Sequence, residues 1–176
     1  MKFLIAALAV TAAIAGPAAA QSAAEKTGIN SVMGVAPSTE DFVQQASASD
    51  MFEIESSKLA LQKGNDKTKG FAQQMINDHE KTSLEMKQMI ESGKVKATPS
   101  TTLASSQSDM LEGLKELNGA EFDEQYIDDQ VTAHENAVDL FKRYSEGGDH
   151  GELKTWAAST LPALQHHLEM VKGMQK

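Results

Sequence analysis

Residues 38–93 decide the fold and read STEDFVQQASASDMFEIESSKLALQKGNDKTKGFAQQMINDHEKTSLEMKQMIESG. Two patterns of helical periodicity follow one another in this stretch, over residues 39–63 and 66–92. Only Gly64 and Asn65 separate them, a pair typical of a helix stop and a turn. Because so short a joint leaves no room for a crossing, the two helices must be antiparallel neighbours.

A second helical hairpin is expected further along the chain. Its helices are predicted over residues 120–146 and 150–174, with Gly147-Gly148 ending the first of them. The connection between the hairpins, residues 94–119, is long enough to run the length of a bundle. The sequence therefore predicts an all-α, ferritin-like four-helix bundle with a long crossover between helices 2 and 3. A plain up-down-up-down order is the alternative.

Residues 1–20 have the features of a cleavable signal peptide. Lys2 gives a positive start, residues 3–14 form an apolar run, and residues 18–20 are three alanines suited to cleavage. A membrane anchor is the alternative, but the run is shorter than the ~20 residues that span a bilayer. We therefore expect export and residence in the periplasm.

The chain after the signal is expected to divide into two parts. Residues 21–37 are rich in Ser, Ala and Gly without apolar periodicity, which predicts a flexible leader. Residues 38–176 are predicted to form the bundle domain. No later segment has the apolar length of a membrane span, so none is expected in the mature protein.

The composition excludes several classes of function. The chain has no cysteine, which rules out thiolate catalysis, iron–sulfur clusters and cysteine zinc sites. Its formal net charge is −9, which disfavours nucleic acid and anionic membrane surfaces as partners. A metal ion or an unidentified protein partner remains compatible with this charge.

Four polar residues fall on or beside the inward faces of the predicted helices. His79, His134 and His167 lie on the inward stripes, and Glu53 lies at the edge of the first stripe. At ~1.5 Å per residue the four positions fall within about 7 Å along the bundle axis. These four positions fall at the same axial level in either topology. Three imidazoles and one carboxylate are a suitable set for zinc, copper or iron.

Two other interpretations stand beside this metal site. A buried histidine is more often a hydrogen-bonded core residue than a ligand. Methionines near the histidines, such as Met75 and Met86, could help to hold copper(I), but methionine at helical spacing is more often core filler. The di-iron site of ferritins needs Glu-x-x-His, and the residues three before the inward histidines are Ile76, Val131 and Leu164. A di-iron ferroxidase is therefore disfavoured.

Several short motifs carry a family resemblance, in order and at the right separations. They are Phe52-Glu53-Ile54-Glu55, Phe71-Ala72-Gln73-Gln74-Met75, Asp78-His79, Ala133-His134-Glu135, Thr160-Leu161-Pro162 and His167-Leu168. Over about residues 40–172 the chain resembles the ferritin-like family known as domain of unknown function 4142, whose members are often labelled outer membrane proteins. The resemblance implies a four-helix domain in exported proteins of Gram-negative bacteria, without an assigned activity. It also implies that the inward histidines and Glu53 are the family's signature positions.

Two functions are consistent with these features. The first is an exported periplasmic bundle of unknown specific activity, a non-catalytic binding protein or one related to envelope stress. The second is a mononuclear transition-metal-binding protein that uses Glu53, His79, His134 and His167. No catalytic residues are predicted. An oxidoreductase built on the metal site is a third hypothesis without a substrate signal of its own.

Overall fold

A computed structural model describes Glu25 and residues 28–175 of the chain. The expected signal peptide and residues 21–24 and 26–27 of the expected leader lie outside the described residues. Regular structure in the described part is helical: α2 (Ile29–Val32), α3 (Thr39–Lys63), α4 (Asp66–Glu91), α5 (Ser105–Glu116), α6 (Gly119–Gly147) and α7 (Gly151–Lys172). None of the helices in this part combines the length and the apolar character needed to cross a membrane.

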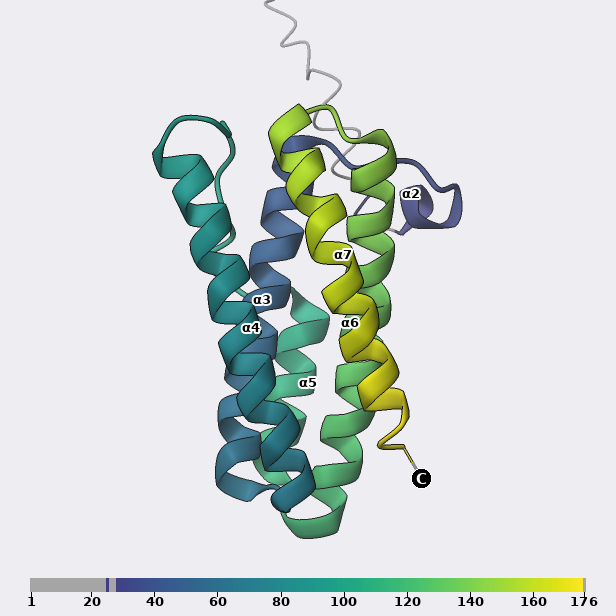
Figure 1. The fold of residues 1–176 in the computed structure, drawn as a ribbon. Coiled ribbons are helices and arrows are strands. Elements are labelled where there is room, and N and C mark those ends of the chain that lie inside the picture. Colours follow the sequence, from purple (N-terminus) through teal and green to yellow (C-terminus); the bar gives the residue numbers. More distant parts are fainter. Residues whose placement is uncertain (1–24, 26–27, 176) are drawn as a thin grey trace, which may run out of the picture.

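The four long helices form two antiparallel hairpins, α3 with α4 and α6 with α7 (Figure 1). The turn between α3 and α4 contacts the start of α6, where the Asn65 side-chain amide donates to Asp123 Oδ2 at 2.7 Å. The chain therefore returns along the whole bundle after α4, and α4 and α6 point the same way. The crossover topology is confirmed, and the plain up-down-up-down order is wrong.

The helix boundaries agree with the sequence patterns to within two residues. Helix α3 begins after Ser38, whose Oγ accepts from the Asp41 amide at 3.1 Å. Asn65 serves as a cap as well as a turn, because its Oδ1 accepts from the amides of Lys67 and Thr68. Pro162 lies inside α7 without ending it.

The crossover contains α5, which packs on α3 and α6. Leu111 and Leu114 are its buried residues. Its end is fixed to the end of α3, where Lys63 Nζ donates to the carbonyls of Lys115 at 2.6 Å and Leu117 at 2.9 Å. These contacts join the long connection to the bundle at the turn where α6 begins.

Part of the expected leader lies against α6. The guanidinium of Arg143 donates to Glu25 Oε1 at 2.8 Å, to Asp139 Oδ2 at 2.8 Å and to the Val35 carbonyl at 2.6 Å. Ser31 Oγ also donates to Asp139, at 2.8 Å. The composition of this segment predicted flexibility and gave no sign of these contacts, because their partners lie more than 100 residues away along the chain.

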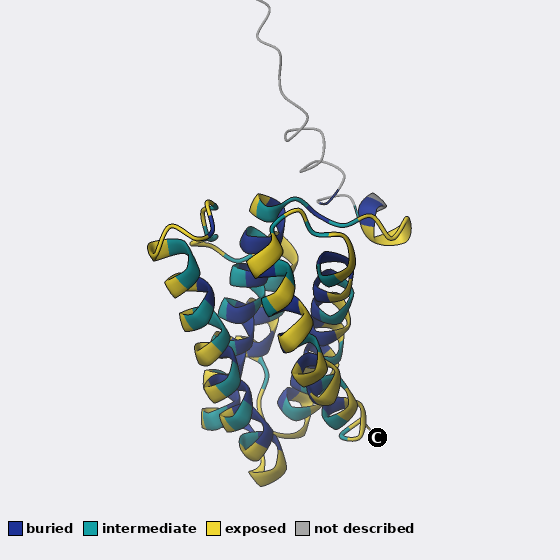
Figure 2. Ribbon diagram, turned by 45° about the horizontal axis from the view of Figure 1, so that its top comes forward, coloured by how far each residue is buried: buried dark blue, intermediate teal, exposed yellow. Residues whose placement is uncertain are grey.

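The interior of the described part of the chain has three apolar clusters, of which the smallest consists of Phe52, Leu111 and Ala133. A polar layer lies between the two larger ones, and Figure 2 shows the buried faces of the long helices turned toward one another. One cluster lies near the start of α3 and includes Phe42, Met86, Ala137, Phe141, Tyr144 and Leu164. The other lies near its end and includes Ala60, Phe71, Met75, Phe122, Tyr126 and Val171. On α4, α6 and α7 the inward histidine lies between a residue of each cluster. The polar layer is therefore closed by apolar side chains above and below.

Candidate metal centre

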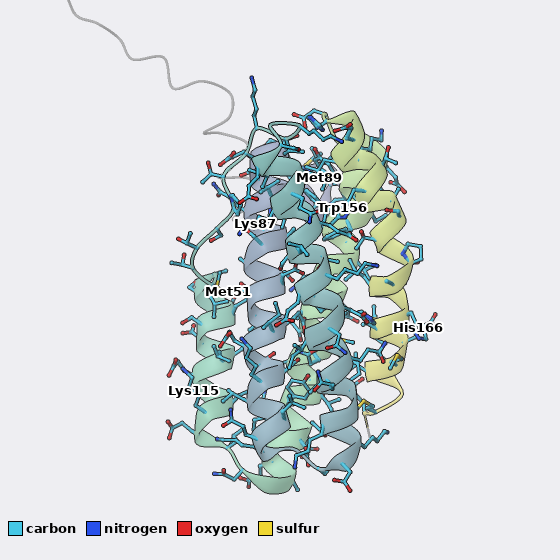
Figure 3. All side chains as sticks on the ribbon, turned by 60° about the vertical axis from the view of Figure 1, so that its left-hand side comes forward. Met51, Lys87, Met89, Lys115, Trp156 and His166 are labelled. Carbon is cyan, nitrogen blue, oxygen red and sulfur yellow. The ribbon has the colours of Figure 1, made fainter. Side chains whose placement is uncertain are left out.

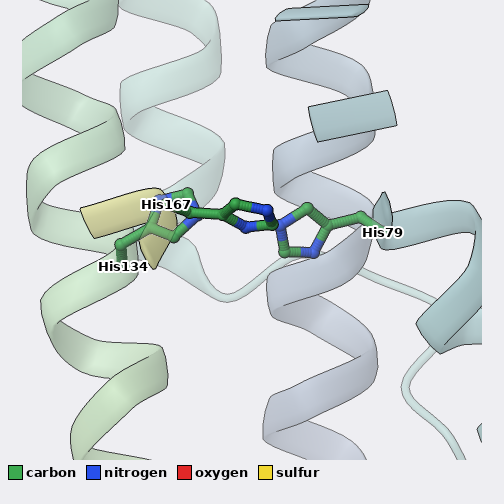
Figure 4. Close-up of side chains that lie close together, drawn as sticks. All are labelled: His79, His134 and His167. Atoms are coloured by element: carbon green, nitrogen blue, oxygen red, sulfur yellow. The ribbon is translucent and has the colours of Figure 1, made fainter. Parts of the chain in front are cut away.

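The three inward histidines meet in the polar layer, one from each of three helices. His79 comes from α4, His134 from α6 and His167 from α7 (Figure 4). Their ring centroids are 5.5 to 5.8 Å apart. One potential ligand nitrogen from each ring lies within 4.8 Å of the others. The three residues are 3%, 0% and 3% exposed, so the centre is enclosed.

Each ring uses one nitrogen for a hydrogen bond to an acceptor of the protein. The pairs are His79 Nδ1 with Asp50 Oδ1 at 2.8 Å, His134 Nδ1 with the Gln130 carbonyl at 2.9 Å, and His167 Nε2 with Asp78 Oδ2 at 2.9 Å. Histidines that bind metals almost always make this bond, because it fixes the tautomer and the orientation of the ring.

The second nitrogen of each ring is buried and makes no hydrogen bond to the protein. These atoms are Nε2 of His79, Nε2 of His134 and Nδ1 of His167. In the neutral rings the acceptors hold the proton on the other side, so each of these atoms carries a lone pair. A buried polar atom without a partner costs about 1–3 kcal/mol. Three of them, on rings whose centroids lie 5.5 to 5.8 Å apart, form a site that a metal ion would stabilise.

The spacing of the rings is close to what one ion requires. Nitrogens bound to a tetrahedral ion at ~2.0–2.1 Å lie about 3.3 Å from one another. In the structure, one nitrogen from each ring lies within 4.8 Å of one nitrogen of each other ring. The rings would therefore move inward by roughly 1 Å to reach bonding distance, which side-chain rotation can supply without a change of fold.

The electrostatic surroundings hold two of the rings neutral. Burial, followed by the charge of His79, lowers the pKa of His134 to about 4. Burial also lowers the pKa of His167 to about 4, followed by the charges of His134 and His79. Neutral imidazole is the form that binds metals.

His79 differs from the other two rings. Burial is the largest influence and lowers its pKa, but the hydrogen bond and charge of Asp50, together with Glu53 and Asp78, raise it overall. Metal binding at this centre would therefore compete with protonation of His79 and should weaken as the pH falls.

Glu53 is next to the centre but outside the group of converging atoms. Its Oε1 lies 3.6 Å from His134 Nδ1, the nitrogen that bonds to the Gln130 carbonyl. Glu53 is 1% exposed, and burial raises its pKa to about 7. The structure thus brings together the three predicted histidines and places the predicted acid behind one of them.

Two carboxylates behind the histidines were missed by the sequence reasoning. Asp50 accepts from His79 and also from Thr82 Oγ1 at 2.9 Å and Ser83 Oγ at 3.0 Å. Asp78 accepts from His167. A signal existed in both cases, since Asp50 precedes Glu53 by one helical turn and Asp78 precedes His79 directly.

The other residues considered as ligands lie elsewhere. His166 is exposed on the outer side of α7 (Figure 3). His150 accepts from the Leu153 amide and caps α7. Met75 and Met86 belong to the two larger apolar clusters. The core-filler interpretation of these methionines fits their packing.

Fold and site together define a four-helix bundle of the ferritin-like kind with a three-histidine layer in its core. The chain belongs to the family described as Domain of unknown function (DUF4142), whose model matches residues 19–174. This confirms the resemblance carried by the sequence motifs. Comparison with curated proteins gave no match.

The chain is also similar to a solved structure, "CopM in the Cu(II)-bound form". The two align with a TM-score of 0.67 and 17% sequence identity, over 80% of this chain and 97% of CopM. At this identity the similarity shows a shared fold.

Proposed function

We propose that this protein binds one transition-metal ion in the core of its bundle, with His79, His134 and His167 as ligands. The observation that carries the proposal is the set of three buried, unpartnered nitrogens, each opposite a nitrogen that is bonded to an acceptor. A purely structural role for the histidines would leave these three atoms unsatisfied at a cost of about 1–3 kcal/mol each.

Copper is the metal that the donor set favours, ahead of zinc. Imidazole suits both ions, and nitrogen sites bind copper(II) more tightly than the other first-row divalent ions. Iron is less suitable, since a ferritin-type site needs carboxylate ligands from several helices. The copper(II)-bound state of CopM, which shares the fold, is consistent with this order.

The site supports binding better than turnover. The histidines are nearly inaccessible, and apolar clusters lie on both sides of them. Two surface hollows of the described chain, about 450 and 610 Å³, have none of these histidines in their walls. Neither hollow would place a substrate beside the ion.

Residence in the periplasm is part of the proposal. The features of residues 1–20 support it: a lysine, an apolar run and an alanine cleavage site. Cell fractionation together with the N-terminal sequence of the exported protein tests it. A cytoplasmic protein that keeps Met1 would contradict it.

Metal content is the experiment that tests the proposed binding. The purified mature protein is dialysed against copper, zinc or iron and analysed by mass spectrometry. We expect one copper or zinc ion per chain, and loss of that ion in His79→Ala, His134→Ala and His167→Ala. His166→Ala is the matched control, since it removes an exposed imidazole from the same helix as His167 and should keep the ion. A metal content near zero in the wild type, or a metal content that is unchanged in the three core histidine variants, would contradict the proposal.

A further inference from the structure

The side of the bundle between α4 and α7 differs from the others. Helices α3 and α4, α6 and α7, and α3 and α6 pack closely along their backbones, whereas α4 and α7 are not among the closely packed pairs. Side-chain hydrogen bonds connect them instead. His167 Nε2 bonds to Asp78 Oδ2 at 2.9 Å, and Trp156 Nε1 donates to Glu85 Oε2 at 2.8 Å. We refer to this side, defined by these two pairs, as the α4–α7 seam.

Asp78 is the only one of the three acceptors behind the histidines that reaches solvent. Its side chain is 45% exposed, whereas the side chain of Asp50 is 9% exposed. The third acceptor is the carbonyl of Gln130, a fully buried residue. Asp78 therefore joins solvent to a histidine of the centre through a single hydrogen bond.

We infer that a metal cation enters and leaves the three-histidine centre through the α4–α7 seam, with Asp78 as its first ligand. The inference rests on the proposed function. An exposed carboxylate attracts a cation and raises its local concentration. When the hydrogen bond between Asp78 and His167 opens, the imidazole is free to turn toward the ion. The ring then carries the ion inward to His79 and His134.

A second route is less direct. The hollow of about 450 Å³ lies between α3, α4 and the crossover, and Ser83 is in its wall. Ser83 and Thr82 both donate to Asp50, which in turn bonds to His79. An ion entering there would have to separate α3 from α4, which pack closely, and break this whole network.

The single tryptophan is a built-in reporter for the experiment. The chain contains one Trp, Trp156, and its indole bonds across the seam. Stopped-flow quenching of its fluorescence by copper(II) measures association with the full mature chain. Chelator-induced recovery measures dissociation.

The variants separate charge from orientation. Asp78→Asn keeps an oxygen that accepts from His167 but removes the charge, so we expect association to slow by about ten-fold and to depend less on salt. Asp78→Glu should restore the rate. Glu80→Gln is the matched control, since it removes the charge of an exposed carboxylate from the same helix in the wall of the hollow, and its association rate should stay within about two-fold of the wild type.

The possible results are distinct. A wild-type association rate in Asp78→Asn overturns the inference, and slow association in Glu80→Gln instead places the entry at the hollow. If the wild-type protein takes up no metal in dialysis, the proposed function itself fails. Circular dichroism of each variant confirms that the bundle is folded.

Discussion

Glu53 gives a prediction whose sign and size follow from its surroundings. Its carboxyl group is 1% exposed, Oε2 makes no hydrogen bond to the described protein, and burial raises its pKa from 4.5 to about 7. The folded state therefore holds a proton on Glu53 more tightly than the unfolded state does. Below pH 4.5 this group stabilises the fold fully, and the contribution is lost as the pH rises through 7.

The size of the contribution follows from the two pKa values. One pKa unit corresponds to about 1.4 kcal/mol, so the full contribution is about 3 kcal/mol. Between pH 5 and pH 8 about 2–3 kcal/mol of it disappears. Glu53→Gln has no carboxyl group to ionise. Its free energy of unfolding relative to the wild type should therefore rise by about 2–3 kcal/mol from pH 5 to pH 8.

Urea unfolding of the metal-free proteins at pH 5, 6.5 and 8 measures this difference. Comparing the variant with the wild type at each pH cancels the contributions of His134 and His167, whose lowered pKa values act in the opposite direction. Glu55→Gln, at a half-exposed position of α3, controls for the general loss of a negative charge. If the free energies of unfolding of Glu53→Gln and the wild type differ by the same amount at pH 5 and pH 8, the reasoning is refuted.

Three further predictions follow from the same structure. Because burial lowers the pKa of His134 to about 4, the free energy of unfolding of the metal-free wild type, relative to His134→Gln, should fall by about 2 kcal/mol between pH 6.5 and pH 5, as urea titrations of both proteins would measure. Copper at 100 times its dissociation constant should raise the free energy of unfolding by about 2.7 kcal/mol and the midpoint by roughly 5–10 °C in calorimetry, with no shift in His79→Ala. Arg143→Ala leaves the buried carboxylate of Glu25 without its cationic partner, while the side-chain amide of Gln45 still donates to it. This substitution should destabilise the protein by about 1–3 kcal/mol and speed amide exchange at residues 28–37. Unchanged exchange would count against the anchoring of these residues to α6.

The long helices could be predicted almost completely, because their signals are local. Apolar periodicity, the glycine stops at Gly64 and Gly147-Gly148, and the cap at Ser38 all lie within a few residues of the boundaries they set. The length of the crossover favoured the correct topology. The packing of residues 28–37, which contain α2, against α6 could not be predicted, because Arg143, which anchors this segment, is remote in sequence.

The site could be predicted in part, for a related reason. Helical periodicity and axial level identify His79, His134 and His167, since both depend only on position along a helix. The hydrogen bonds of the rings depend on rotamers and on the partner helix, so the sequence shows the positions of Asp50 and Asp78 but not the ring to which each of them bonds. Glu53 was at the predicted level, but its rotamer places the carboxylate beside Nδ1 of His134.

The central claim is that three imidazoles from three helices hold one ion, and X-ray absorption at the copper edge tests it most directly. The copper-loaded mature chain should show three nitrogen neighbours at about 2.0 Å, with the outer-shell scattering of imidazole rings. His134→Ala should remove one of them or abolish the signal. A first shell of oxygen or sulfur, or a spectrum unchanged in His134→Ala, would contradict the account.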